Sequence, residues 1–312
     1  MENSNKEQNF VSLVAYVHNN KNLIKDFYEE MNGFLKSKFL NYEIIFVDDA
    51  STDGSIDELK SVVSTENGGS LSIITMSYFQ GKEKSLNAGS DLALGDFVYE
   101  FDSVFINYKI DVLWQMYEAA LGNNDIVVAS EKNSERFMSK MFYFVFNHFA
   151  NIQYEIGTER MRLVSRRAIN RVKMLNEYSM YSKATYANSG LNRKTISYEA
   201  TIHVNKKKLS RNQNRFSHAL NNLILFTNFF YRFSLFLSIL MLLLTIFAVI
   251  YTLVLYLSGN AVTGWSTTML YISFGFFGIF LFFTIVIKYL DLLVRMNFSH
   301  QDYLVKDVDK FR

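Results

Sequence analysis

The sequence contains no cysteine and no proline. The lack of cysteine excludes disulfide bonds and thiolate metal sites, and it is compatible with a reducing compartment. Because proline is absent, turns must be built from the 14 glycines or from asparagine, aspartate and serine. A strong charge of either sign is also lacking: 32 Lys and Arg against 30 Asp and Glu give a formal net charge of +2. The overall charge therefore predicts no nucleic-acid partner.

The first ten residues, MENSNKEQNF, contain no apolar run of the kind found in signal peptides. We therefore expect the domain that follows to stay in the cytosol. A length of 312 residues is enough for one large domain and a smaller module.

Short apolar segments alternate with helical patterns through the first half of the chain. The predicted strands are 10–17, 42–47, 71–76, 96–101 and 125–129, and helical patterns occupy 21–35 and 82–93. This alternation is typical of an α/β, Rossmann-like domain with a mostly parallel sheet. In such sheets ligands bind at the carboxyl ends of the strands.

An aromatic segment at 135–152 repeats apolar residues at helical spacing, among them Phe137, Met141 and Phe144. An amphipathic helix of this kind packs on a sheet or lies in a membrane surface, and the pattern alone leaves both possibilities open.

Two long uncharged runs, 233–257 and 267–287, are each long enough to span a bilayer. Basic residues precede the first run and follow the second, and the positive-inside rule places both flanks in the cytoplasm. The sequence thus predicts a cytosolic domain at 1–205 and a basic juxtamembrane segment at 206–232. A two-helix transmembrane hairpin and a cytosolic tail at 288–312 follow, so the whole is an integral membrane protein of the plasma (inner) membrane.

Acidic residues follow two of the predicted strands. Asp48 and Asp49 end one of them, and Glu100 and Asp102 stand where the run Phe97 to Tyr99 stops. Paired carboxylates at strand ends hold a hard cation beside a phosphate, or they accept hydrogen bonds from a base or a ribose. They also serve as solvated loop and cap residues, although two adjacent buried aspartates are costly without partners.

Four segments occur in the order expected of one family: VSLVAYVHNN, YEIIFVDDASTDGS, LNAGSDLALGDFVYEFD and RLVSRRAI. From about residue 11 to 172 the chain resembles a family 2 glycosyltransferase with the GT-A nucleotide-sugar fold. The aromatic helix and the two apolar runs make it similar to the membrane-anchored branch that charges a polyprenyl phosphate with a single sugar.

The resemblance implies a role for each acidic cluster. Glu100 and Asp102 would hold Mg²⁺ or Mn²⁺ on the diphosphate of a nucleotide-sugar donor, which by analogy with bacterial relatives would be UDP-linked. The nucleotide itself would be contacted by Asp48, Asp49, His18 and Asn19.

The resemblance also implies an acceptor site. A polyprenyl phosphate is already anionic at neutral pH and needs cations more than a general base. The candidates are Arg162, Arg166, Lys132 and Arg215. Arg162 and Arg166 join Asp102 as the expected catalytic residues, and a single in-line displacement would invert the anomeric centre.

The chain departs from the family pattern at several positions. Asn20 replaces a usual glutamate, Lys132 replaces an arginine, and Glu100 replaces the first aspartate of an Asp-x-Asp pair. Two other functions therefore stay open: extension of a glycan already linked to lipid, and a catalytically weak membrane scaffold. A homo-oligomer is also open, because aromatic membrane helices contact subunits as readily as lipid.

Overall fold

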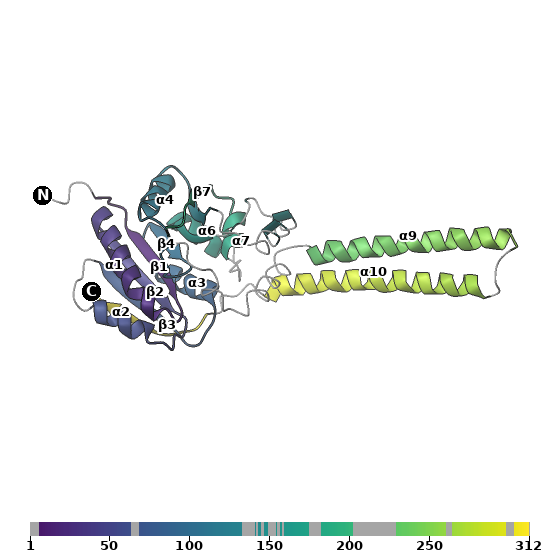
Figure 1. Cartoon of the computed structure of the whole chain (residues 1–312), viewed down its shortest axis with the longest axis horizontal. Helices are drawn as coiled ribbons and strands as arrows, with labels where there is room; N and C mark the ends of the chain where they lie inside the picture. Colours follow the sequence, from purple (N-terminus) through teal and green to yellow (C-terminus); the bar gives the residue numbers. More distant parts are fainter. Residues whose placement is uncertain are drawn as a thin grey trace. The chain divides into compact units, whose positions relative to one another are not determined.

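The computed structural model describes residues 6–63, 69–132, 141, 143–144, 147–148, 154, 157, 159–174, 182–201, 229–259, 264–297 and 303–311. The strands are β1 Val11–Val17, β2 Tyr42–Asp48, β3 Ser70–Met76, β4 Phe97–Phe101, β5 Ile126–Glu131, β6 Glu159–Ser165, β7 Arg193–Tyr198 and β8 Val305–Phe311. The helices are α1 Lys21–Lys38, α2 Ser55–Val63, α3 Lys82–Leu92, α4 Asp111–Leu121, α6 Arg166–Met174, α7 Ser182–Asn188, α9 Phe229–Leu257 and α10 Trp265–Asn297. Figure 1 shows these elements along the chain.

One sheet runs through the first compact unit in the order β7-β5-β6-β4-β1-β2-β3-β8. Strands β4, β1, β2 and β3 are parallel neighbours, and so are β5 and β7. Strand β6 is antiparallel to both β4 and β5, and β8 is antiparallel to β3. The carboxyl ends of β1, β2 and β4 therefore meet at one edge of the sheet, together with the start of β6.

Helices cover both faces of this sheet because alternate side chains of each buried strand point to opposite faces. On one face α1, α2 and α4 pack against Leu13, Phe46 and Tyr99. On the other face α3, α6 and α7 pack against Val14, Val47 and Val98. The predicted α/β fold class is confirmed, and five of the predicted strands correspond to β1 to β5.

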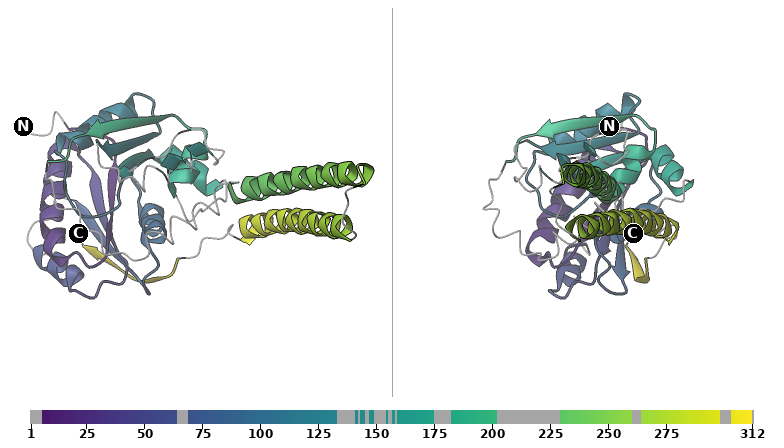
Figure 2. Two further views of the ribbon diagram at one scale, coloured as in Figure 1. Left: turned by 45° about the vertical axis from the view of Figure 1, so that its right-hand side comes forward. Right: turned by 90° about the vertical axis from the view of Figure 1, so that its right-hand side faces the viewer.

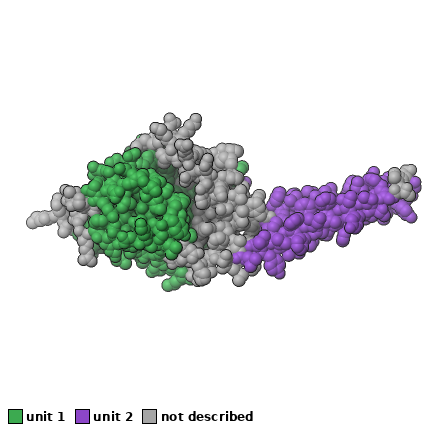
Figure 3. All heavy atoms as spheres, turned by 90° about the horizontal axis from the view of Figure 1, so that it is seen from below, with its two compact units in different colours: residues 1–143, 152–211, 299–312 green, residues 144–151, 212–298 purple. Residues whose placement is uncertain are grey.

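The segment predicted as a cytosolic tail contains a strand that the sequence did not reveal. Strand β8 pairs antiparallel with β3, with Leu71 opposite Phe311 and Ile73 opposite Asp309. Residues 299–312 consequently belong to the same compact unit as the sheet, whereas 212–298 belong to the second unit (Figure 3).

The second unit consists mainly of α9 and α10, which lie side by side in every view (Figure 2). Tyr231–Leu257 and Thr267–Leu290 are long and apolar enough to cross a membrane, and their large apolar side chains are mostly exposed. Between the helices the hydroxyl of Thr284 lies 2.9 Å from those of Ser234 and Ser238. Hydroxyl pairs of this kind join helices that have no water around them.

Two predicted segments lie largely outside the described residues. Of the aromatic segment 135–152, residues 141, 143–144 and 147–148 are described and are helical. Phe144 stacks on His148 there, with ring centroids 6.2 Å apart. The basic stretch 206–215 is not among the described residues.

Candidate functional site

Two loops at the carboxyl edge of the sheet interlock through backbone and side-chain hydrogen bonds. The ring Nδ1 of His18, after β1, lies 2.7 Å from the carbonyl oxygen of Asp49, after β2. The Asn19 carboxamide oxygen accepts a hydrogen bond from the N–H of Thr52 at 2.9 Å. Asn19 and Ala50 both adopt a φ of 54°, which costs energy for residues with a Cβ and is concentrated at functional sites. The four predicted nucleotide-binding residues therefore form one cluster.

The Asp49 carboxylate is fully buried, and both of its oxygens accept hydrogen bonds from other residues of the protein. Its Oδ1 accepts the N–H of Gln80 at 2.7 Å, and its Oδ2 accepts the N–H of Gly81 at 2.8 Å. The hydroxyl of Tyr16 donates to Oδ2 at 3.1 Å. Burial, with the nearby Asp49 charge second, raises the pKa of Tyr16 far above its ordinary value, so Tyr16 keeps its proton. Asp49 thus fixes the loop before α3.

Asp48 is buried in the same cluster with fewer partners. Its Oδ1 accepts the N–H of Ser51 at 3.2 Å. Burial raises the pKa of the Asp48 carboxyl, and the bonds from Ser51 and the nearby His18 only partly offset this. A carboxylate held in this way gains from any donor that a ligand brings to it.

Asp102 follows β4 and is held by a lysine that the sequence did not single out. Lys82, the first residue of α3, places its Nζ 2.5 Å from Asp102 Oδ2. Burial acts to raise the pKa of Asp102, but the charges of Lys82 and Lys183 outweigh it, and the pKa lies below its ordinary value. The Asp102 backbone N–H donates to the carbonyl of Arg160 at 3.0 Å, which fixes the residue against β6.

Glu100 has a different environment from Asp102. It lies inside β4, opposite Arg162 of β6, and it is only 3% exposed. One carboxylate oxygen pairs with the Arg162 guanidinium, and the other accepts the hydroxyl of Ser90 at 2.5 Å. Because side chains alternate along a strand, Glu100 shares the face of Val98 and points under α3 rather than out of the strand end. The structure places it in a buried ion pair instead of at an open metal position.

Arg162 is correspondingly enclosed, with 5% of its surface exposed. Its guanidinium carbon lies 4.9 Å from the centre of the Tyr186 ring in addition to the Glu100 contact. Burial acts to lower the pKa of Arg162, but the Glu100 charge outweighs it, so the guanidinium stays charged. The positive charge of Arg162 therefore acts on Asp102 through space and helps to lower the Asp102 pKa.

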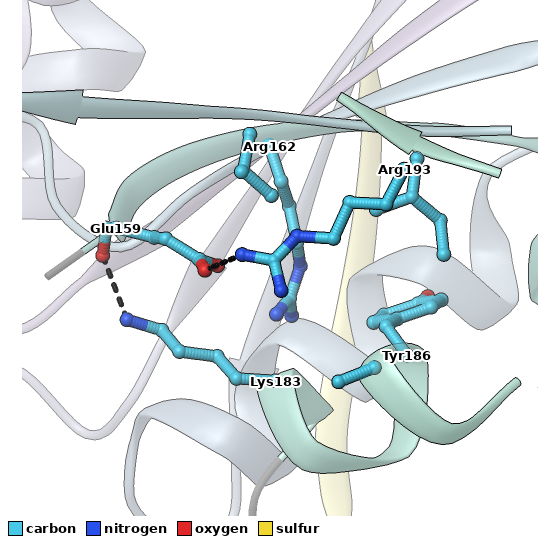
Figure 4. Close-up of a pocket in the computed structure, with 8 residues that line it drawn as sticks. Glu159, Arg162, Lys183, Tyr186 and Arg193 are labelled. Atoms are coloured by element: carbon cyan, nitrogen blue, oxygen red, sulfur yellow. Dashed lines mark hydrogen bonds and ion pairs between the residues drawn. The ribbon is translucent and has the colours of Figure 1, made fainter. Parts of the chain in front are cut away.

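A small pocket beside Arg162 is lined by charged residues that pair with one another (Figure 4). Glu159 accepts Lys183 at its backbone carbonyl oxygen, 2.8 Å from Nζ, and it pairs with Arg193 through its carboxylate. Lys183 is half-buried and contributes positive charge toward Asp102.

Arg166 lies at the opposite edge of the sheet. Its guanidinium donates to the carbonyl oxygens of Ala93 and Gly95, both at 2.8 Å from one terminal nitrogen. These residues precede β4, whereas Asp102 follows it, so the length of the strand separates Arg166 from the acidic cluster. The structure does not bring Arg166 to the site.

The other predicted phosphate ligands divide between the site and the undescribed part of the chain. Lys132 follows β5 at the carboxyl edge, is more than half exposed, and lies 3.8 Å from Glu199. Arg215 lies outside the described residues.

The donor set fits a divalent cation that arrives with a diphosphate. Among the described residues no cluster of three or more His, Asp or Glu forms a closed cage. Asp102 offers one partly accessible carboxylate, and Mg²⁺ is commonly held by one or two carboxylates together with substrate phosphates. Glu100 does not fit, because both its oxygens are engaged and buried.

Sequence reasoning missed Lys82, Gln80, Lys183 and Phe79. Phe79 is 51% exposed, and its ring centroid lies 4.7 Å from that of His18. The only signal in the sequence was the Gly81-Lys82 pair opening a helical pattern after a strand. Glycine there has a φ of 91°, which allows the tight entry into α3.

Comparisons with known proteins indicate the family of the chain. The sequence profile described as Glycosyl transferase family 2 matches residues 12–173. CsbB of Bacillus subtilis, named as a glycosyltransferase, is 25% identical over 268 residues, which cover 84% of this chain and 80% of CsbB. The bactoprenol glucosyl transferase of Shigella phage SfV is 29% identical over 181 residues, and the match covers 55% of this chain and 57% of that protein. The solved mannosyltransferase PcManGT from Pyrobaculum calidifontis, in complex with GDP-Man and Mn²⁺, superposes with a TM-score of 0.47 at 16% identity, covering 70% of this chain and 71% of PcManGT.

Proposed function

Because the chain belongs to glycosyl transferase family 2, we propose that it transfers one sugar from a nucleoside-diphosphate sugar to the phosphate of a polyprenyl lipid. The observation that carries the proposal is the Lys82–Asp102 pair, which directly follows the two backbone N–H groups that bind Asp49 in the cluster with His18. Relatives named as bactoprenol glucosyl transferases support the lipid acceptor.

In this proposal the donor base and ribose bind at the ends of β1 and β2. The tilted ring pair of His18 and Phe79 offers an aromatic surface for a base. Asp48 accepts hydrogen bonds from the base or the ribose, and Asn19 lies in the same cluster. Asp49 supports the site indirectly and does not contact the nucleotide, because its carboxylate already accepts hydrogen bonds from Gln80, Gly81 and Tyr16.

The diphosphate binds where Lys82 meets Asp102. Asp102 would hold Mg²⁺ or Mn²⁺, which supplies positive charge against the departing nucleoside diphosphate. Lys82 is placed to bind the phosphates, since its ammonium group lies beside the Asp102 carboxylate. Arg162 stays buried and strengthens the positive field from below.

The acceptor phosphate needs no general base, because its oxygen is anionic at neutral pH. Half-buried Lys183 and exposed Lys132 are candidate cations for this phosphate, and Arg215 is a further candidate from the basic segment. Attack on the anomeric carbon from the face opposite the leaving diphosphate would invert that centre.

A membrane location is supported by α9 and α10. Helices that expose so many large apolar side chains are stable in a bilayer and costly in water. We propose that they anchor the sheet domain at the cytoplasmic face, which the basic flanks of the hairpin favour.

A catalytically weak scaffold is the second candidate, and one observation favours it. The first carboxylate of the usual acidic pair is withdrawn into the Glu100–Arg162 ion pair. The scaffold hypothesis predicts that no donor is consumed even when a nucleotide binds.

The test is transfer of radiolabel from a panel of nucleotide sugars to undecaprenyl phosphate in detergent. Reactions with Mn²⁺, with EDTA and with Asp102→Asn are compared. Asp309→Asn serves as a matched control, because Asp309 of β8 pairs with Lys60 of α2. Label entering the lipid with one donor, lost with EDTA and with Asp102→Asn but kept in the control, supports the proposal. Nucleotide binding without transfer from any donor favours the scaffold or a glycan-bearing acceptor.

A further inference from the structure

The chain returns to the sheet domain after α10, directly beside the loop that precedes α3. Helix α10 ends at Asn297, and Tyr303 already contacts the domain, since its hydroxyl donates to Asp91 of α3 at 2.7 Å. Strand β8 then runs along β3, and the register shifts between Thr75 and Met76, where β3 approaches the site. Shifts of this kind re-aim a chain near functional sites.

A single side chain, that of Gln80, binds both the backbone N–H and the backbone carbonyl oxygen of Leu304. The Gln80 carboxamide nitrogen donates to the Leu304 carbonyl oxygen at 2.7 Å, and the Gln80 carboxamide oxygen accepts the Leu304 N–H at 2.9 Å. The backbone N–H of Ser77 donates to the same carbonyl oxygen at 3.0 Å. A primary amide is the neutral side-chain group that can donate to and accept from one residue in this way.

The backbone of this loop builds the proposed donor site. The N–H groups of Gln80 and Gly81 both donate to the Asp49 carboxylate. The next residue, Lys82, pairs with Asp102. Phe79, which precedes Gln80, packs on the ring of His18. Four consecutive residues therefore connect both halves of the site, and the side chain of one of them grips the C-terminal segment.

We propose that Gln80 is a positioning residue, and that the segment Tyr303–Phe311 holds loop 77–82 in the conformation that binds the nucleotide diphosphate. The reason is entropic as well as geometric. The loop carries exposed Tyr78 and Phe79 and Gly81 in the left-handed region, so it has many alternative conformations to lose. The Gln80–Leu304 bonds restrict them before the ligand arrives, which lowers the ordering cost of binding.

The attachment of β8 does not itself depend on Gln80. Backbone pairing runs from Leu71–Phe311 to Met76–Val305, and Lys60 pairs with Asp309 at 2.6 Å on α2's side of the strand. Removing the Gln80 side chain should thus free the loop while β8 stays in place. Lys60→Ala weakens a contact of the same strand far from the loop and is the matched control.

The experiment uses the full chain in detergent and three proteins: wild type, Gln80→Ala and Lys60→Ala. Binding of UDP and of GDP, each with Mn²⁺, is measured by calorimetry, and amide hydrogen exchange is followed in peptides covering 77–84. Loss of two hydrogen bonds is expected to weaken nucleotide binding about tenfold in Gln80→Ala. Exchange in 77–84 should become faster, because the N–H groups of Gln80 and Gly81 lose their fixed acceptor geometry. Lys60→Ala should match wild type in both measurements.

The proposal rests on the proposed function for its ligand, but the two can fail separately. Wild-type affinity or unchanged exchange in Gln80→Ala would overturn the role of Gln80. Equal weakening in Gln80→Ala and Lys60→Ala would overturn it as well, because the effect would then come from general loosening of β8. If wild type binds neither nucleotide, the proposed function loses its basis, and hydrogen exchange alone tests the role of Gln80. Faster exchange confined to 77–84 in Gln80→Ala then supports that role.

Discussion

At the scale of single residues, this protein uses buried charges for structure as much as for chemistry. The Glu100–Arg162 pair is enclosed between β4, β6, α3 and α7, and each partner leaves an uncompensated charge if the other is removed. Breaking such a pair is far more costly than replacing both partners.

We expect Arg162→Met to lower the free energy of unfolding by about 3–5 kcal/mol. The double variant Glu100→Gln, Arg162→Met should recover part of the loss, because no charge is left unpaired. Urea unfolding in detergent measures this by Trp114 fluorescence in a Trp265→Phe background, since the sequence has two tryptophans. A double variant less stable than Arg162→Met would contradict the prediction.

Arg166 should behave differently despite its similar place in the sequence. Arg166→Met removes charge-assisted hydrogen bonds to the carbonyl oxygens of Ala93 and Gly95, and we expect a loss of about 1.5–3 kcal/mol in stability. The dissociation constant of UDP or GDP should not change, because the contacts lie at the other edge of the sheet. A large loss of nucleotide affinity in a folded variant would place Arg166 in the site after all.

The two site aspartates should affect stability with opposite signs of pH dependence. The Asp48 pKa is raised in the folded state, so its contribution is most favourable below its ordinary pKa and declines as pH rises through the raised value. The Asp102 pKa is lowered, so its contribution is present above the ordinary pKa and is lost as pH falls.

Asp48→Asn should therefore raise the thermal unfolding midpoint at pH 7, and Asp102→Asn should lower it. Thermal scans of both variants between pH 4 and pH 7 measure the difference. A fall in midpoint for Asp48→Asn at pH 7 would show that its carboxylate has a stronger partner than Ser51.

At the scale of elements, the position of α3 decides where Lys82 and loop 77–82 lie. Gly89 of α3 faces β1 and β2 so closely that a Cβ at this position would overlap the side chains of Val14 and Val47. The glycine thus allows the helix to lie against the sheet.

Gly89→Ala should force α3 away from the sheet and cost about 1–3 kcal/mol through overpacking. The shift should also weaken nucleotide binding, since Lys82 begins this helix. Urea unfolding and calorimetry test the two effects together. Gly33→Ala in α1 is the control, because a Cβ there meets nothing within 4 Å. Equal effects of both substitutions would refute the packing argument.

The elements differ in how well the sequence predicts them. Strands β1 to β5 are mostly apolar runs between turn residues, and their local pattern was sufficient. Strand β8 reads VKDVDKF, with charges at four of seven positions, and its partner β3 lies more than 200 residues earlier. No local pattern encodes such a pairing, so the sequence indicated only a tail.

The candidate site shows the same division. Asp48 ends β2, Asp49 and Asp102 follow β2 and β4, and all three were found because ligands bind at strand ends, whereas Glu100 was expected at the open end of the strand although it lies within it. With β4 ending at Phe101, alternation alone puts Glu100 on the face of Val98 and inside the sheet. The Lys82 and Gln80 contacts depend on how a loop folds back on the sheet, which spacing does not reveal.

At the scale of the whole molecule, the two apolar helices are inserted within the chain of the sheet domain. Strands β1 to β7 precede the hairpin and β8 follows it, yet all of them belong to one sheet. If the hairpin spans a membrane twice, both of its ends must therefore emerge on the same side.

A chain in which residues 229–297 are replaced by a short glycine–serine linker should retain the sheet domain. We expect it to be recovered from the aqueous fraction and to bind nucleotide with an affinity within about threefold of the full protein, while transfer to a polyprenyl phosphate in membranes is lost. Fractionation, calorimetry and the transfer assay measure these outcomes. Loss of nucleotide binding in a folded chain would mean that the hairpin supports the donor site directly.

The place of β8 also has a consequence for biosynthesis. Strand β3, SLSIITM, carries no charge, and its outer edge stays without a partner until the ribosome has made both membrane helices. At usual elongation rates this takes on the order of ten to fifty seconds, during which the bare edge is open to pairing with other chains. When β8 arrives it covers that edge and presents Lys306, Asp307, Asp309 and Lys310 on the new outermost strand. A nascent chain stalled within the hairpin should consequently be the form of this protein most prone to aggregate.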